Sequence, residues 1–86
     1  MTRLPRPDAH LQRIALELGW SLEETEGTLV GSRRLTTRQA ADYLGVHPGT
    51  LNRWSNQGAG PPRDFRGRYP QRWLERWEAL RARAAG

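Results

Sequence analysis

Apolar residues near the start of the chain recur at the spacing of an amphipathic helix. They fall at i, i+3, i+4 and i+7, which predicts a helix over residues 9–18 with one apolar face. Asp8 stands where an N-cap is expected, and Gly19 supplies a left-handed stop. The apolar face consists of Leu11, Ile14, Ala15 and Leu18.

A second helix start follows almost at once. Ser21 and Glu24 have the spacing of a capping box, in which each side chain binds the backbone amide of the other residue. Gly27 predicts that this helix is short, because glycine costs about 1 kcal/mol in a helix interior. Residues 28–30 (Thr-Leu-Val) then favour a short strand.

The residues that mark the starts and ends of helices are easier to identify beyond residue 35. Thr36 and Gln39 form another capping box, which predicts a helix over residues 37–44 that ends at Gly45. Its inward face consists of Ala40, Ala41 and Leu44.

A further helix is expected over residues 48–57, ending at Gly58. Pro48 suits the first helical position because its missing N–H has no partner there, and His47 is the expected, unusual N-cap. Only residues 45–47 separate this helix from the preceding one, and two short helices joined by such a turn are typical of a helix-turn-helix.

Residues 63–69 read as strand, turn and strand. Gly67 permits the reversal, and alternation along the strands predicts that Phe65 and Tyr69 pack inward on one face. A hairpin this short needs support from the helices.

Pro70 opens the last expected helix, over residues 70–84, with a core-facing stripe. Together with Trp54, the tryptophans of this stripe are expected in the core, and Trp20 is expected to anchor the N-terminal segment. The stripe consists of Trp73, Leu74, Trp77 and Leu80.

The composition limits what such a chain does. Its 86 residues predict an N-terminal arm and helical extension (1–34) and one small domain (35–86). Without cysteine, disulfides and thiolate metal sites are excluded, and neither histidine has a partner at metal-ligand spacing. We therefore expect no metal, no cofactor and no enzymatic activity. No apolar run approaches a membrane span and no secretory signal is present, so we expect a cytoplasmic protein.

Charge is unevenly distributed. All fourteen basic residues are arginine and the net charge is +5. Residues 1–34 balance five arginines with five acids, so the whole excess lies in residues 35–86. This asymmetry indicates a nucleic-acid partner, since guanidinium groups suit phosphates and guanine edges.

Two groups of residues are candidates for DNA contact. On a helical wheel, Leu51 and Trp54 point toward the preceding helix, and the opposite face carries groups that read major-groove bases. The second group surrounds Gly67 and suits the DNA backbone or the minor groove. The candidates are Gly49, Thr50, Asn52, Arg53 and Asn56 on the helix, and Arg63, Arg66 and Arg68 in the hairpin.

The segments LTTRQAADYLGVHPGTLNRW and GPPRDFRGRYPQRWLERW resemble the excisionase and MerR-type winged helix-turn-helix family over about residues 35–80. The resemblance implies a mainly α fold with a small β-hairpin, the wing. It also implies that Thr50, Asn52 and Arg53 read the major groove and that Arg66 and Arg68 enter the minor groove. Thr37 and Arg38 would touch phosphate.

Small members of that family are recombination directionality factors. The resemblance therefore implies a bacterial, nucleoid-associated, DNA-bending protein of a mobile element, whose adjacent copies bind double-stranded DNA together and act with a tyrosine recombinase in DNA recombination. The alternatives are a small protein of transcription regulation with the same fold, and a protein-interaction module such as an antiactivator.

Overall fold

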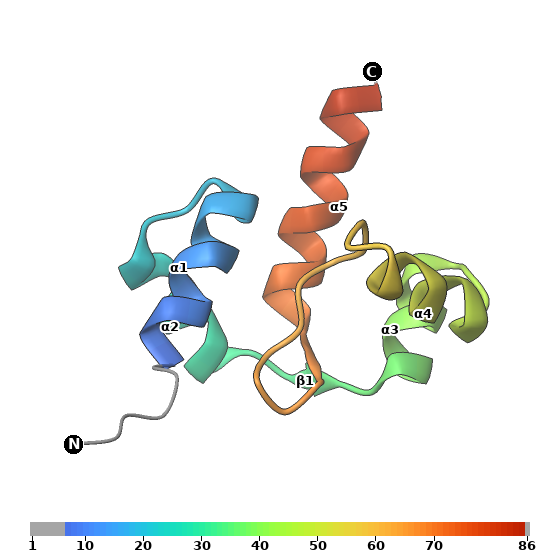
Figure 1. Ribbon diagram of the computed structural model, residues 1–86, viewed down its shortest axis with the longest axis horizontal. Coiled ribbons are helices and arrows are strands. Elements are labelled where there is room, and N and C mark those ends of the chain that lie inside the picture. Colours follow the sequence, from blue (N-terminus) through green and yellow to red (C-terminus); the bar gives the residue numbers. More distant parts are fainter. Residues whose placement is uncertain (1–6, 86) are drawn as a thin grey trace.

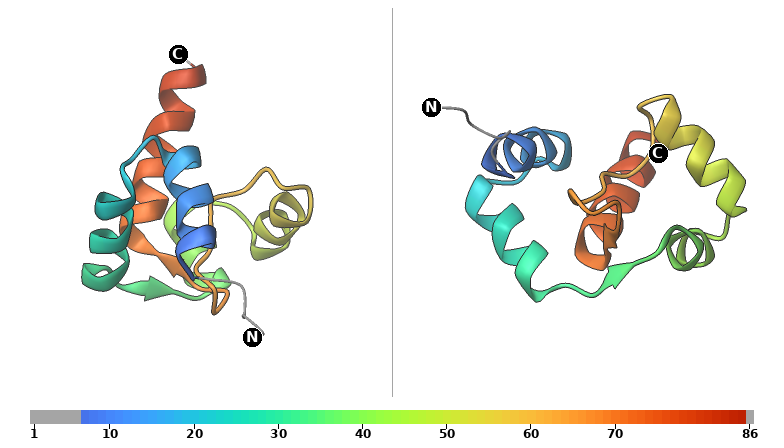
Figure 2. Two further views of the ribbon diagram at one scale, coloured as in Figure 1. Left: turned by 60° about the vertical axis from the view of Figure 1, so that its left-hand side comes forward. Right: turned by 60° about the horizontal axis from the view of Figure 1, so that its bottom comes forward.

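The computed structural model describes residues 7–85, which form a mainly helical fold, as predicted. Of the arm expected at residues 1–7, residues 1–6 lie outside this range, and Pro7 belongs to the first helix instead. The longest helix, α5, lies between the α1–α2 pair and the α3–α4 pair (Figures 1 and 2). The elements are α1 (Pro7–Leu18), α2 (Leu22–Gly31), β1 (Arg34–Leu35), α3 (Thr37–Leu44), α4 (Pro48–Asn56), β2 (Tyr69–Pro70) and α5 (Gln71–Ala85).

Helix α1 begins at Pro7, so the expectation that Asp8 caps it is wrong: Asp8 lies inside the first turn. Proline suits a first helical position, where no N–H is required. Gly19, at φ 68°, ends the helix as expected. The apolar stripe is buried inside the molecule, against α2 and α5, so it is not available for contact with a second copy.

Helix α2 runs further than expected. The capping box is present, with both amide bonds between Ser21 and Glu24 at 3.0–3.1 Å. The predicted break at Gly27 and the predicted strand at residues 28–30 are both wrong, because the helix continues to Gly31. Thr25 and Leu29 are buried on its inner face, and this packing outweighs the roughly 1 kcal/mol cost of an exposed helical glycine.

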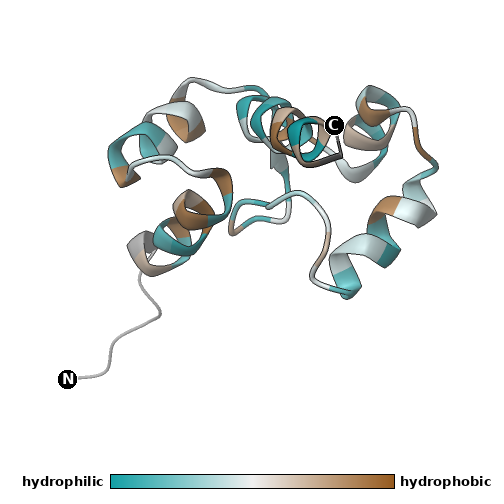
Figure 3. Cartoon of the chain, turned by 90° about the horizontal axis from the view of Figure 1, so that it is seen from above, coloured by the Kyte–Doolittle hydropathy of each residue, from teal (hydrophilic) through white to brown (hydrophobic). Residues whose placement is uncertain are grey.

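Two buried clusters flank α5. Trp73 packs with Ile14 and Leu18, whereas its neighbour Leu74 packs with Ala40 and Leu51. Consecutive residues of a helix point about 100° apart, so one helix serves both clusters. Each helix accordingly carries apolar and polar residues (Figure 3). The predicted boundary at 34/35 falls inside β1 and stays a prediction.

The only sheet in the described residues is not the expected hairpin. β1 pairs antiparallel with β2, with Arg34 opposite Pro70 and Leu35 opposite Tyr69. The strand predicted on the N-terminal side of Gly67 is absent from this part of the chain. The Asp64 amide binds the Arg68 carbonyl across the turn, but the amides of Arg66 and Arg68 bind the Asp64 side chain instead of a facing strand, so no ladder extends from the turn.

The tryptophans differ in depth. Trp73 is fully buried, as expected, and its Nε1 donates to the Thr28 hydroxyl at 2.9 Å. Trp54 and Trp77, also expected in the core, pack against its two clusters but remain half-buried, with their ring centroids 6.1 Å apart. Trp20 packs against the cluster that contains Trp73, as expected of a residue that anchors the N-terminal segment.

Among residues 7–85, none of the helices combines the length and apolar character needed to cross a bilayer.

Candidate nucleic-acid interface

Helix α3 has well-formed ends. The side chain of Thr36 accepts from the Gln39 amide at 3.1 Å, and the Gln39 side chain accepts from the Thr36 amide at 3.0 Å. Gly45 is left-handed (φ 72°, ψ 31°), and the amide of Val46 binds the carbonyl of Ala41 at 3.0 Å, as in a Schellman motif. The predicted bounds of this helix are confirmed.

Helix α4 begins with an imidazole cap, as the sequence predicts. The Nδ1 atom of His47 accepts from the Gly49 amide at 2.9 Å, and Pro48 follows His47. A Cβ at position 49 would lie 3.1 Å from that nitrogen, so glycine leaves the cap undisturbed. The helix ends at Asn56, one residue earlier than predicted.

Helix α4 presents an uncharged core face and a polar outer face. Leu51 is fully buried and Trp54 half-buried, whereas Asn52, Arg53 and Asn56 are exposed. Gly49 is exposed as well, Thr50 is partly exposed, and the helix carries no acidic residue. The two faces therefore lie where the helical wheel predicts them.

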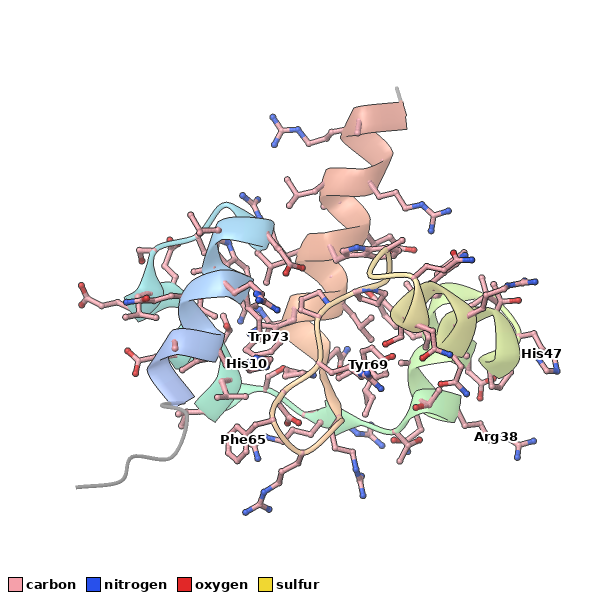
Figure 4. All side chains as sticks on the ribbon, viewed as in Figure 1. His10, Arg38, His47, Phe65, Tyr69 and Trp73 are labelled. Carbon is pink, nitrogen blue, oxygen red and sulfur yellow. The ribbon has the colours of Figure 1, made fainter. Side chains whose placement is uncertain are left out.

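The start of α3 adds to this surface. Thr37 is partly exposed and Arg38 is exposed. Figure 4 shows the Arg38 and His47 side chains extending outward on the same side of the molecule. The structure thus joins the first group of candidates and the two residues of α3 in one compact unit of two helices.

A tight turn follows at residues 64–68, and the carboxylate of Asp64 organises it. Its Oδ1 accepts from the amides of Arg66 at 2.8 Å and Arg68 at 2.9 Å. The Asp64 amide binds the Arg68 carbonyl at 2.8 Å, and Gly67 is left-handed at φ 79°. This is the hydrogen-bond pattern of a three-residue hairpin loop.

The turn displays positive charge. Arg63, Arg66 and Arg68 are exposed, whereas the Asp64 side chain is 1% exposed and pairs with Arg34 at 3.7 Å. The expectation that Phe65 packs inward is wrong, because its side chain is 63% exposed. Phe65 lies in a turn, where the alternation of a strand does not hold. The structure therefore brings the second group of candidates together on this turn.

Sequence reasoning missed three residues around the turn. Asp64 is not among the candidates, although Asp at the first and Gly at the fourth position of a turn is a known signal. Arg34 was assigned to the N-terminal extension. His10, from α1, donates through Nε2 to the Arg63 carbonyl at 3.0 Å, a contact across 53 residues that no local pattern reveals.

Tyr69 anchors the turn in the core. It is fully buried, and this burial raises the pKa of its hydroxyl, an effect that the positive charge of Arg63 offsets only in part. The hydroxyl forms no hydrogen bond with the described residues. The turn is therefore fixed on one side by Asp64 and on the other by a packed ring.

Two capped helices joined by a three-residue turn, with the second helix exposing its polar face, define a helix-turn-helix unit. Residues 34–79, more than half of the chain, match the sequence model of the helix-turn-helix domain family. The chain therefore belongs to this family. Comparison with curated proteins and with solved structures gave no match. Membership of this family indicates sequence-specific DNA binding.

Proposed function

We propose that this chain is an architectural DNA-binding protein of the excisionase type, with α4 in the major groove. The exposed, acid-free face of α4 carries this proposal. In the proposed complex, Arg53 donates two hydrogen bonds to a guanine, Asn52 pairs with an adenine edge, and Thr50 contacts a base or a phosphate. Catalysis forms no part of the proposed role.

The turn at residues 64–68 acts as the wing. Arg66 and Arg68 follow the adjacent minor groove, whose negative potential attracts guanidinium groups. The Asp64 carboxylate, which would otherwise repel phosphate, is occupied by the turn's own amides and by Arg34. Arg38, at the start of α3, contacts the phosphate backbone.

Several copies act together on DNA. A single module of this size buries about 600–1,000 Å² of protein on a duplex, so a stable complex requires neighbouring copies. Because the α1 stripe is buried within the molecule, contacts between copies use other surfaces. The resemblance to recombination directionality factors supports DNA bending that directs a tyrosine recombinase.

Selection of binding sites from random duplexes, followed by fluorescence anisotropy, tests this proposal. We expect an enriched motif, and an affinity that falls with salt at a slope near −2.7 for about three neutralised phosphates. Arg53→Ala should reduce discrimination between the motif and random DNA by about 5- to 150-fold. Arg83→Ala removes the same charge from the exposed end of α5 and should preserve discrimination.

The wing and the architectural role have their own readouts. Removing both Arg66 and Arg68 should weaken binding to all sequences and reduce the bend angle, whereas an unchanged bend would exclude the turn from bending. A footprint that extends stepwise with protein concentration supports neighbouring copies. One isolated, unbent site instead indicates a transcription regulator, and absence of DNA binding at low salt contradicts the whole proposal.

A further inference from the structure

Phe65 is a large apolar side chain with no role in the fold. Its ring is 63% exposed, and neither buried cluster includes it. Figure 4 shows it extending from the turn, away from the buried Tyr69. A partner that covers this much exposed apolar surface lowers the free energy of the system.

The turn holds the ring in place. Asp64 immediately precedes Phe65, and its Oδ1 accepts from the amides of Arg66 at 2.8 Å and Arg68 at 2.9 Å. His10 donates through Nε2 to the carbonyl of Arg63 at 3.0 Å. Phe65 is therefore carried on a braced loop tip, and positioning its ring costs little additional entropy on binding.

The surroundings of the ring indicate the chemistry of the partner. Arg63, Arg66 and Arg68 surround it within six residues, and the Arg66 guanidinium lies 6.0 Å from the ring centroid. The only carboxylate of the segment is buried and paired. An apolar ring with a rim of guanidinium groups complements the flat faces of stacked bases between two anionic backbones.

We propose that Phe65 is a wedge that enters between two adjacent base pairs from the minor groove. The flanking arginines then bind the phosphates on either side of the opened step. Apolar side chains inserted in this way unstack the step and kink the duplex by about 20–90°. This inference rests on the proposed DNA binding and supplies a physical origin for the bend.

The test uses the full chain and its selected duplex, with 2-aminopurine placed in turn at each step and a dye pair at the two ends. Wild-type protein should raise the 2-aminopurine fluorescence at one step and shorten the end-to-end distance. Phe65→Ala should abolish both signals and weaken binding by about 5- to 150-fold. Its salt slope should stay unchanged because no charge is lost, and its fold should be intact because the ring is exposed.

Leu16→Ala is the matched control, because Leu16 is also exposed (84%) but lies on α1. It should retain the fluorescence rise, the bend and the affinity. Phe65→Leu should retain part of the unstacking, since leucine also forms wedges.

Each other outcome is decisive. If Phe65→Ala binds the duplex with the wild-type bend and fluorescence, the wedge is refuted while DNA binding stands. Equal losses in the Leu16→Ala control refute the wedge as well. If wild-type protein binds no duplex at low salt, the proposed function itself fails.

Discussion

Replacing Asp64 by asparagine separates the structural role of this carboxylate from its charge. The change preserves the size of the side chain and one carbonyl acceptor, and raises the net charge from +5 to +6. Coulomb attraction alone predicts that Asp64→Asn binds DNA more tightly. The structure predicts weaker binding, because the acceptor that orders the backbone of Arg66 and Arg68 loses its negative charge and binds their amides less strongly.

The loss of stability follows from the contacts of the carboxylate. Two amide hydrogen bonds to a charged acceptor are roughly twice as strong as bonds to a neutral one, so neutralising the acceptor costs about 1 kcal/mol for each bond. The ion pair with Arg34 is 3.7 Å long and its guanidinium is 37% exposed, so it adds at most about 0.5 kcal/mol. We expect Asp64→Asn to lower the free energy of unfolding by about 2 kcal/mol.

Thermal unfolding and DNA titration provide the assay. A loss of about 2 kcal/mol corresponds to a fall in Tm of about 8–16 °C for a domain of this size. The control is Asp42→Asn, which removes the same charge from an exposed position on α3. It should change stability by less than about 0.5 kcal/mol and bind DNA slightly more tightly.

The reasoning fails on one clear result. If both asparagine variants unfold at the wild-type temperature and bind DNA more tightly to the same extent, then Asp64 acts as a surface charge. The turn would then owe its shape to other residues.

Four further substitutions test the core and the cap of α3. Trp73→Ala should lower the free energy of unfolding, measured by chemical denaturation, by about 3–5 kcal/mol because Trp73 is fully buried. Trp54→Ala should lower it by less because Trp54 is only half-buried. Because burial raises the pKa of the Tyr69 hydroxyl, folding favours its neutral form. The stability that this residue contributes is therefore present below pH 10 and is lost as the pH rises further. Tyr69→Phe should flatten that decline in unfolding curves measured at a series of pH values. Thr36→Ala should cost about 1 kcal/mol in urea unfolding, since it removes the cap of α3.

Local signals were sufficient at several helix ends, although not at Asp8 or Gly27. The capping boxes at Ser21 and Thr36 and the left-handed Gly45 are in place, because each depends on contacts within a few residues. The imidazole cap of His47 was predicted for the same reason. The two-helix unit and the faces of α4 were thus readable from the sequence.

Tertiary contacts decided the rest. The length of α2 depends on the burial of Leu29, which outweighs the helix-breaking tendency of Gly27. The partner of β2 is β1, more than thirty residues away in sequence, and no local pattern specifies it. Phe65 was misplaced because a carboxylate, not a second strand, satisfies the amides beside it.

Mapping amide chemical shifts during titration with the selected duplex tests the central claim most directly. The account predicts that the perturbed amides belong to the start of α3, the exposed face of α4 and residues 63–68, while α2 and the outer face of α1 stay unperturbed. Perturbations confined to α1 and α2, with α4 unaffected, would contradict it.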